Sequence, residues 1–295
     1  MKLIRSQSQC VLMTVLVVCG FSLFVGAAED AFAADQDPCG WKLGTQAYSF
    51  NQFTFFEAVD KTKSLGLRYI EAYPGQKLSP ENSTQFNHDA PPEVLEAAKA
   101  KLEEAGIKLV NYGVVSLGKN EAANRKVFDF AKKMGIETIV SEPPPGCFEL
   151  LDKLTAEYGI KVAIHNHPKP SRYWNPDTVL EAVKGCSNRI GACADTGHWM
   201  RSGVNPLDAL KKLEGRIVSF HFKDLNEFGT KKAHDVPWGT GKGDVKAMLT
   251  EVKRQNFKGV FSIEYEHNWK NSVPEIAECV KYFNKVAKEL SEGGE

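Results

Sequence analysis

The chain has 295 residues, and its 37 Lys and Arg side chains equal its 37 Asp and Glu side chains, so the formal net charge at pH 7 is zero. Because no basic excess exists to attract nucleic acid or an anionic membrane surface, neither is expected as a partner of the mature protein. The length exceeds that of most single domains but is ordinary for an α/β barrel.

The first 33 residues are predicted to be a secretion signal peptide. Lys2 and Arg5 supply a short positive segment, the apolar run 11–28 follows, and Ala31-Phe32-Ala33 offers the small residues that signal peptidase prefers. A retained N-terminal anchor is the alternative, because the apolar run is almost long enough to span a bilayer. We therefore expect an exported protein, periplasmic or extracellular.

Residues 41–292 are predicted to form one domain, preceded by a short segment at 34–40. Short runs rich in β-branched and aromatic residues alternate with longer stretches of helical pattern, which is typical of parallel βαβ units. The eight expected strands are 42–49, 67–73, 108–115, 137–142, 161–167, 190–196, 216–223 and 259–266. Because the unit recurs eight times at similar size, we expect a closed (β/α)8 TIM barrel of the α/β class, with a doubly wound open sheet as the alternative.

Proline and glycine mark the helix boundaries. Pro91-Pro92 opens one predicted helix, which stops at Gly106, and Asn205-Pro206 opens another. The two longest connections, 74–90 and 224–244, both follow predicted strands. Since barrels build their active sites from the loops that follow the strands, we expect these two loops to border a site.

Five cysteines follow the predicted signal peptide, and no two of them have C-x-x-C spacing. Export permits disulfides, but a domain of this length does not need them, and mostly buried thiols are expected. A bridge between Cys186 and Cys193 is the alternative that the spacing leaves open.

Acidic and imidazole side chains stand near the carboxyl ends of four predicted strands. Glu142 ends the fourth, Asp195 lies at the end of the sixth, His221 in the seventh and Glu264 in the eighth. In a barrel these ends meet at one mouth, where carboxylates repel unless a cation binds or their pKa values rise. The pattern therefore predicts one divalent metal ion held by Glu142, Asp195, His221 and Glu264.

Carboxylate and imidazole ligands without thiolates suit Mn²⁺, Mg²⁺ or Co²⁺, and Zn²⁺ is also compatible. Each residue has a second interpretation. Glu142 precedes three prolines and could be a solvated loop residue, Asp195 could cap the following helix, and His221 could be a core residue between two phenylalanines. Glu266 competes with Glu264, because residues two apart share one face of a strand.

The order Glu142, Asp195-x-x-His198, His221 and Glu264 resembles the xylose-isomerase-like barrel superfamily, which includes the sugar phosphate isomerases/epimerases. The resemblance covers the whole predicted domain. It implies that the four residues are the metal ligands and that His198 contacts substrate. It also implies that Glu142 and Glu264 flank the substrate as catalytic residues, one removing a proton and the other returning it.

Further side chains at strand ends and in the following loops are candidates for substrate binding. The group is His165 and His167 on one face of strand five, Lys223, Glu71, Tyr48 and Trp238. Each also has a structural alternative: one of the two histidines could be merely structural, Lys223 could face the surface, and Trp238 could simply pack. Glu71 and Tyr48 are expected to border the pocket.

The resemblance implies proton abstraction next to a carbonyl, through an enediolate, by a sugar isomerase or epimerase. Export and the lack of a clear Lys/Arg cluster favour a free sugar or keto-sugar over a sugar phosphate. Ketose 3-epimerases carry an Arg six residues after the strand-seven histidine, and Glu227 stands there in this chain. A lyase or dehydratase acting by β-elimination is therefore the alternative. A non-catalytic sugar-binding barrel and a phosphodiesterase resembling endonuclease IV are less favoured, and a homo-oligomer is compatible with the sequence.

Overall fold

The structure, a computed structural model, describes residues 38–293. The predicted signal peptide and most of the segment at 34–40 lie outside the described residues. A short 3-10 helix, η1 (Pro38–Gly40), opens the described part. Within this part no helix combines the length and the apolar character needed to cross a membrane.

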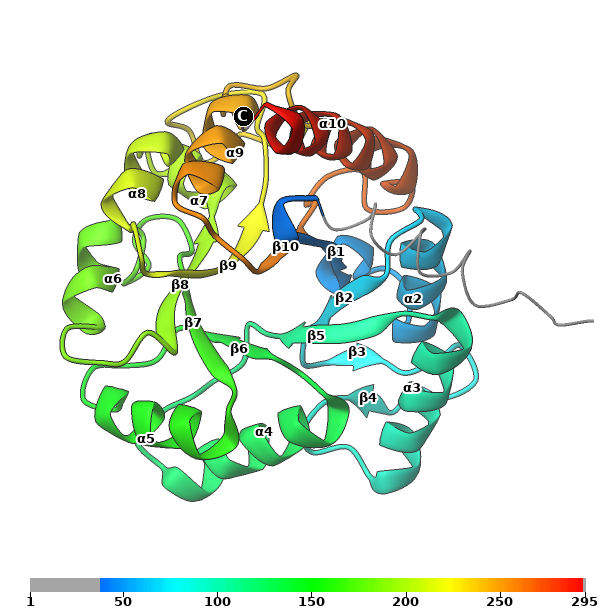
Figure 1. Cartoon of the computed structure of the whole chain (residues 1–295). Helices are drawn as coiled ribbons and strands as arrows, with labels where there is room; N and C mark the ends of the chain where they lie inside the picture. The colour runs from blue at the N-terminus through cyan, green and yellow to red at the C-terminus, as the bar shows by residue number, and fades with distance from the viewer. Residues whose placement is uncertain (1–37, 294–295) are drawn as a thin grey trace, which may run out of the picture. The chain divides into compact units, whose positions relative to one another are not determined.

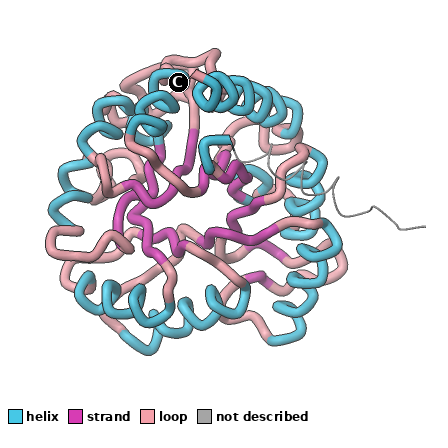
Figure 2. The backbone as a smooth tube through the Cα atoms, viewed as in Figure 1, coloured by secondary structure: helices cyan, strands magenta, loops and turns pink. Residues whose placement is uncertain are grey.

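Eight parallel strands close into a barrel in the order β1-β10-β9-β8-β7-β6-β5-β2, which confirms the predicted fold class. In Figure 2 the strands form a continuous inner ring. The bounds are β1 (Lys42–Gln46), β2 (Tyr69–Ala72), β5 (Lys108–Tyr112), β6 (Thr138–Ser141), β7 (Lys161–His165), β8 (Ile190–Asp195), β9 (Ile217–Phe222) and β10 (Val260–Ile263). Every strand lies inside its predicted range. Most of the predicted ranges extend beyond the carboxyl end of the observed strand. The additional residues lie outside the hydrogen-bonded strand pairs and form the mouth of the barrel.

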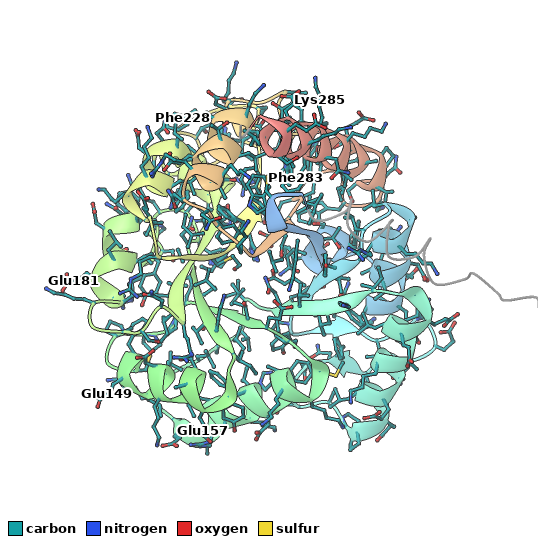
Figure 3. The ribbon with its side chains drawn as sticks, viewed as in Figure 1. Glu149, Glu157, Glu181, Phe228, Phe283 and Lys285 are labelled. Atoms are coloured by element: carbon teal, nitrogen blue, oxygen red, sulfur yellow. The ribbon has the colours of Figure 1, made fainter. Side chains whose placement is uncertain are left out.

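Helices surround this ring (Figure 1). They are α2 (Phe55–Ser64), α3 (Pro92–Ala105), α4 (Glu121–Met134), α5 (Phe148–Tyr158), α6 (Pro176–Ala182), α7 (Thr196–Arg201), α8 (Pro206–Lys212), α9 (Val245–Arg254) and α10 (Val273–Glu292). The predicted boundaries at Pro92 and Pro206 are confirmed, and Gly106 ends α3 with a φ of 71°, which glycine adopts without strain. Figure 3 shows Glu149, Glu157 and Glu181 on the outer faces of α5 and α6.

The loop after β2, one of the two long connections in the sequence, contains a small antiparallel sheet of β3 (Gln76–Lys77) and β4 (Gln85–Phe86). The ring of Phe86 stacks on Phe55 of α2 with centroids 4.3 Å apart and also meets Phe130 of α4. This buried aromatic contact anchors the loop to the helices. The loop sequence shows no alternation of apolar and polar residues that would predict a strand.

The main hydrophobic core combines side chains of the strands with side chains of the surrounding helices. Phe220 and Phe261 stack at 4.5 Å inside the main core, and Trp41 is fully buried with its indole N–H donated to the carbonyl of Phe257 at 3.1 Å. All five cysteines among the described residues are free thiols, so the alternative bridge between Cys186 and Cys193 is absent. The polar side chains gather at the carboxyl ends of the strands.

Candidate metal centre and substrate cavity

A cavity of about 240 Å³ opens at the mouth where the strands end. Its lining comes from strand ends and the loops after them: Gln46, Tyr48, Tyr73, Pro74, Gly113, Val114, His165, His167, His198, Glu264 and Glu266. Of these described lining residues, none is Lys or Arg, so the wall offers no permanent cation to an anionic group. Its polar side-chain groups are imidazoles, carboxylates, an amide and the phenol hydroxyls of Tyr48 and Tyr73.

Four side chains meet beside this cavity: His165, Asp195, His221 and Glu264. One donor atom from each lies within 4.8 Å of the others, and all four side chains are buried. Strands β7, β8 and β9 carry the first three residues at or near their carboxyl ends, and Glu264 directly follows β10. The structure thus unites three of the four predicted ligands and adds His165. We call these four residues the buried cluster.

The fourth predicted ligand, Glu142, lies outside the buried cluster, in an adjoining group with His165 and His167. Its Oε1 accepts hydrogen bonds from the backbone N–H of His167 at 3.0 Å and from Nδ1 of the same residue at 2.5 Å, and its Oε2 accepts one from Ser171 Oγ at 2.8 Å. Burial opposes ionisation, but the neighbouring imidazoles of His165 and His167 hold the pKa of Glu142 well below its usual value. Glu142 is therefore a restrained carboxylate, not a solvated one.

Glu71, expected to border the cavity, lies beneath it and is fully buried. Its Oε1 is 2.8 Å from Nε2 of His221, and its Oε2 accepts a hydrogen bond from Ser262 Oγ at 2.6 Å. A carboxylate that accepts a hydrogen bond from one ring nitrogen of a histidine fixes the orientation of the ring and leaves the other nitrogen free to bind a metal. Glu71 therefore orients His221 and does not face substrate.

The buried cluster suits a divalent cation. Within the described part of the chain, both ring nitrogens of His165 and Nδ1 of His221 are buried without a hydrogen bond. His221 Nδ1 lies 3.2 Å from a Glu264 oxygen, and His165 Nε2 lies 3.5 Å from an Asp195 oxygen. Buried polar atoms rarely stay unpaired, and an ion between these imidazole and carboxylate groups would satisfy Nδ1 of His221 and one ring nitrogen of His165. The residues present therefore fit the predicted metal ion.

Lys223 is fully buried, and its ammonium group supplies a positive charge inside the site. Its Nζ lies 2.8 Å from Asp195, 2.7 Å from Glu264 and 2.9 Å from Glu266. Burial alone would lower the pKa of Lys223, but these carboxylates raise it well above its usual value. The alternative, in which Lys223 faces the surface, is wrong. Its ammonium group is the counter-ion of these three carboxylates.

His198 is held by a residue that the sequence analysis missed. Arg201 Nη1 lies 3.0 Å from His198 Nδ1 and 2.6 Å from Glu266 Oε2, and Nη2 lies 3.1 Å from Asp235. Because arginine only donates, Nδ1 of His198 accepts and Nε2 carries the proton. Burial lowers the pKa of His198 to about 3, so this imidazole is neutral. The available clue was spacing, since Arg201 is three residues after His198 on α7.

Asp195 caps α7, as its alternative interpretation predicts, and also belongs to the buried cluster. Its Oδ1 accepts the backbone N–H of His198 at 2.6 Å and so caps α7, while Oδ2 faces Lys223 and His165. Trp238, by contrast, is not on the cavity wall. It is buried in the core, with Phe222 at 4.9 Å and Phe283 at 6.1 Å between ring centroids, which is the packing alternative.

A sequence profile of the xylose isomerase-like TIM barrel family matches residues 59–285. An inosose dehydratase of Clostridium botulinum (strain Alaska E43 / Type E3) is 27% identical over 157 residues, which cover 48% of this chain and 51% of that enzyme. The chain therefore spans about half the length of this curated relative.

Two solved structures are also similar. A protein of Parabacteroides distasonis is 37% identical, with a TM-score of 0.68 and coverage of 83% of this chain and 99% of the other. A xylose isomerase-like TIM barrel protein from Mycobacterium smegmatis, in complex with magnesium, has a TM-score of 0.67 at 14% identity, covers 85% of this chain and 98% of its own, and shows the fold alone. The chain belongs to the xylose isomerase-like TIM barrel family.

Proposed function

We propose that this protein is a divalent-metal-dependent isomerase or epimerase that acts on a non-phosphorylated sugar or keto-sugar. The observation that carries the proposal is the buried cluster of His165, Asp195, His221 and Glu264 beside a small polar cavity. Family membership supports an enzyme, because the family includes carbohydrate epimerases and dehydratases. The predicted signal peptide supports a site of action in the periplasm or outside the cell.

The four residues of the buried cluster would hold the ion, and their mixed oxygen and nitrogen donors suit Mn²⁺, Mg²⁺ or Co²⁺, or Zn²⁺. The magnesium in the Mycobacterium smegmatis relative supports this choice of cofactor. When bound, such an ion polarises a substrate carbonyl and makes the neighbouring C–H more acidic. Glu71 would keep the His221 ring in place for it.

The cavity wall favours an uncharged carbohydrate. A phosphate group is usually met by Arg, Lys or a helix N-terminus, and no Lys or Arg lies among the described lining residues. Hydroxyl groups of a sugar would instead find the imidazoles of His165, His167 and His198 and the amide of Gln46. His198 would donate through its Nε2–H, because Arg201 occupies the other nitrogen.

Glu264 is the proposed base, because it lines the cavity and is kept ionised. Burial disfavours its charge, but Lys223 and His221 hold the pKa of Glu264 well below its usual value. Glu142 follows β6, which stands opposite β10 in the barrel order, so the two carboxylates would face opposite sides of a substrate that lies between them. Return of the proton to the opposite face of the same carbon gives epimerisation, and return to the neighbouring carbon gives isomerisation.

β-Elimination is the second candidate, and the restraint on Glu142 favours it. Three hydrogen bonds hold this carboxylate, and it is not among the residues that line the cavity. An elimination needs one base for the C–H bond and a proton donor for the leaving group, so Glu264 would act without Glu142. The similarity to inosose dehydratase supports this reaction class.

The experiment that tests the proposal is solvent-deuterium incorporation by the metal-loaded protein across free sugars, keto-sugars and glycosides. Exchange without release of a group indicates isomerisation or epimerisation, and release of water or an aglycone indicates elimination. Glu264→Gln and His221→Ala should each lower the rate by at least about a hundredfold, whereas Glu149→Gln on the outer face of α5 should not. Wild-type rates in the first two variants, or no reaction with any sugar, would reject the proposed function.

A further inference from the structure

Three aromatic side chains form one side of the cavity mouth. Tyr48 meets Tyr73 edge to face, with centroids 5.1 Å apart and planes at 81°, and meets Trp269 in the same way at 5.7 Å and 86°. Tyr48 lies in the short 3-10 helix η2 (Ala47–Phe50) after β1, and Tyr73 and Trp269 lie in the loops after β2 and β10; these three strands are neighbours in the barrel. We call this group the aromatic wall.

The aromatic wall remains open to solvent although its rings are fixed. Tyr48 is 38% exposed, and among the described residues the other large apolar side chain of this exposure is Phe228, at 48%, which does not line the cavity. Tyr48 and Tyr73 both line the cavity. Two edge-to-face contacts hold the Tyr48 ring, so a ligand would find it already ordered, with little conformational entropy left to lose.

The cavity itself has room for one small ring. Its volume of about 240 Å³ lies below the range of roughly 300–1,000 Å³ that drug-sized ligands occupy. Any further ring of a substrate must therefore lie outside the cavity, at the mouth. Sugar and aryl rings both present an apolar face, and aromatic side chains attract the slightly positive C–H groups of such a face or edge.

We infer that the substrate is a two-ring keto-glycoside, whose carbonyl-bearing sugar lies in the cavity beside the buried cluster while its second ring packs on the aromatic wall. This inference rests on the proposed carbohydrate function and narrows its substrate class. The second ring is a sugar or an aryl group, since both offer the same apolar face. Neither source of this ring needs a charged partner, in agreement with the absence of Lys and Arg from the described lining.

Titration calorimetry of the metal-loaded protein tests the inference with methyl, phenyl and glucosyl derivatives of α- and β-D-glucose. At least one two-ring probe should bind about fivefold to tenfold more tightly than the matching methyl glycoside. The double substitution Tyr48→Ala with Trp269→Ala should bring this ratio close to one. Tyr48→Phe, which keeps the ring, and Phe228→Ala, which removes the other exposed aromatic side chain, should preserve it.

Equal affinity for the methyl and two-ring probes would overturn the inference, and so would a preference that survives the double substitution. A gain with phenyl but not glucosyl derivatives would support it and identify the second ring as an aryl group. If deuterium exchange occurs on free monosaccharides and no probe shows the preference, this inference fails while the proposed function stands. If no sugar binds or exchanges, both fail.

Discussion

At Lys223 the chain buries an ammonium group within 2.9 Å of three carboxylates, from Asp195, Glu264 and Glu266. Each of these carboxylates carries a pKa below its usual value, because although burial opposes ionisation, the lysine charge favours it. One side chain thus keeps both the proposed base and a proposed ligand ionised. This explains why a cluster of acids can persist in a largely dry site.

Lys223→Met should lower the free energy of unfolding of the chelator-treated protein by about 3 kcal/mol or more, because it leaves buried carboxylates without their counter-ion. Denaturant titration measures this change. Lys246→Met, which breaks the exposed pair with Glu289, is the matched control and should have a much smaller effect. Equal losses in the two variants would mean that Lys223 does not stabilise the acids.

His165 and Glu142 are the two candidates for the fourth metal ligand. The structure places His165 in the buried cluster and Glu142 beside it, 3.5 Å from Nδ1 of that histidine. His165→Ala should weaken metal affinity by at least about tenfold, whereas Glu142→Gln should keep the metal and lose turnover. Competition with a chromogenic chelator measures the affinity, with His88→Ala as control. The opposite pattern would make Glu142 the ligand, as the sequence predicts.

The connection between β9 and α9 is ordered by a single carboxylate. Asp224 accepts the backbone N–H groups of Gly239, Gly241 and Gly243, each at 2.9 Å. A Cβ at Gly241 would lie 2.3 Å from the Asp224 carboxylate, so this turn requires glycine. The same connection carries Asp235, which contacts Arg201 and through it His198. The order of this loop therefore helps to fix the position of His198 in the cavity wall.

Asp224→Ala should loosen this loop, because three backbone donors lose their buried acceptor. We expect a loss of about 2–3 kcal/mol in the free energy of unfolding, together with faster tryptic cleavage at Lys242 in the native protein. Limited proteolysis followed by mass spectrometry measures the cleavage. Asp208→Ala, on the exposed face of α8, is the control, and equal cleavage in both variants would contradict the role of Asp224.

Over the whole molecule, the proposed metal ion links the strands of the barrel. Its four donors come from β7, β8, β9 and the end of β10, so binding joins segments that span 100 residues of chain. A ligand that binds only the folded state stabilises it by an amount that grows with its concentration relative to Kd. The stability of the domain should therefore depend on the metal.

Removal of the metal should lower Tm by roughly 10 °C, because a ligand at 1,000 times its Kd contributes about 4 kcal/mol. His221→Ala should abolish this metal-dependent increment, and differential scanning calorimetry with and without chelator measures it. An unchanged increment in His221→Ala would show that the ion binds elsewhere.

The increase in Tm that the metal causes should become larger as pH rises. Burial lowers the pKa of His221, but Cys193, Glu71 and Glu264 together outweigh it and hold this pKa well above its usual value in the metal-free protein. A metal ion must then displace a proton from Nδ1, so affinity falls as pH falls and rises as pH rises. Calorimetry at pH 6, 7 and 8 should show a growing increment, and a constant one would contradict proton release.

The sequence by itself determined the barrel, the position of its eight strands and three residues of the buried cluster. These follow from local pattern: strands alternate with helices, and Asp195, His221 and Glu264 stand at or near strand ends, which any parallel barrel brings to one mouth. His198 was predicted from the resemblance of Asp195-x-x-His198 to the family pattern, not from periodicity.

Only the tertiary structure decided which side chains meet across the mouth. Glu71 bonds to His221, 150 residues away, and Arg201 bonds to Glu266, 65 residues away. Such pairs depend on strand stagger, barrel closure and the direction of each side chain, none of which leaves a local pattern. For the same reason Trp238 entered the core while Tyr48 gained its aromatic neighbours at the mouth: packing between distant segments fixed their positions.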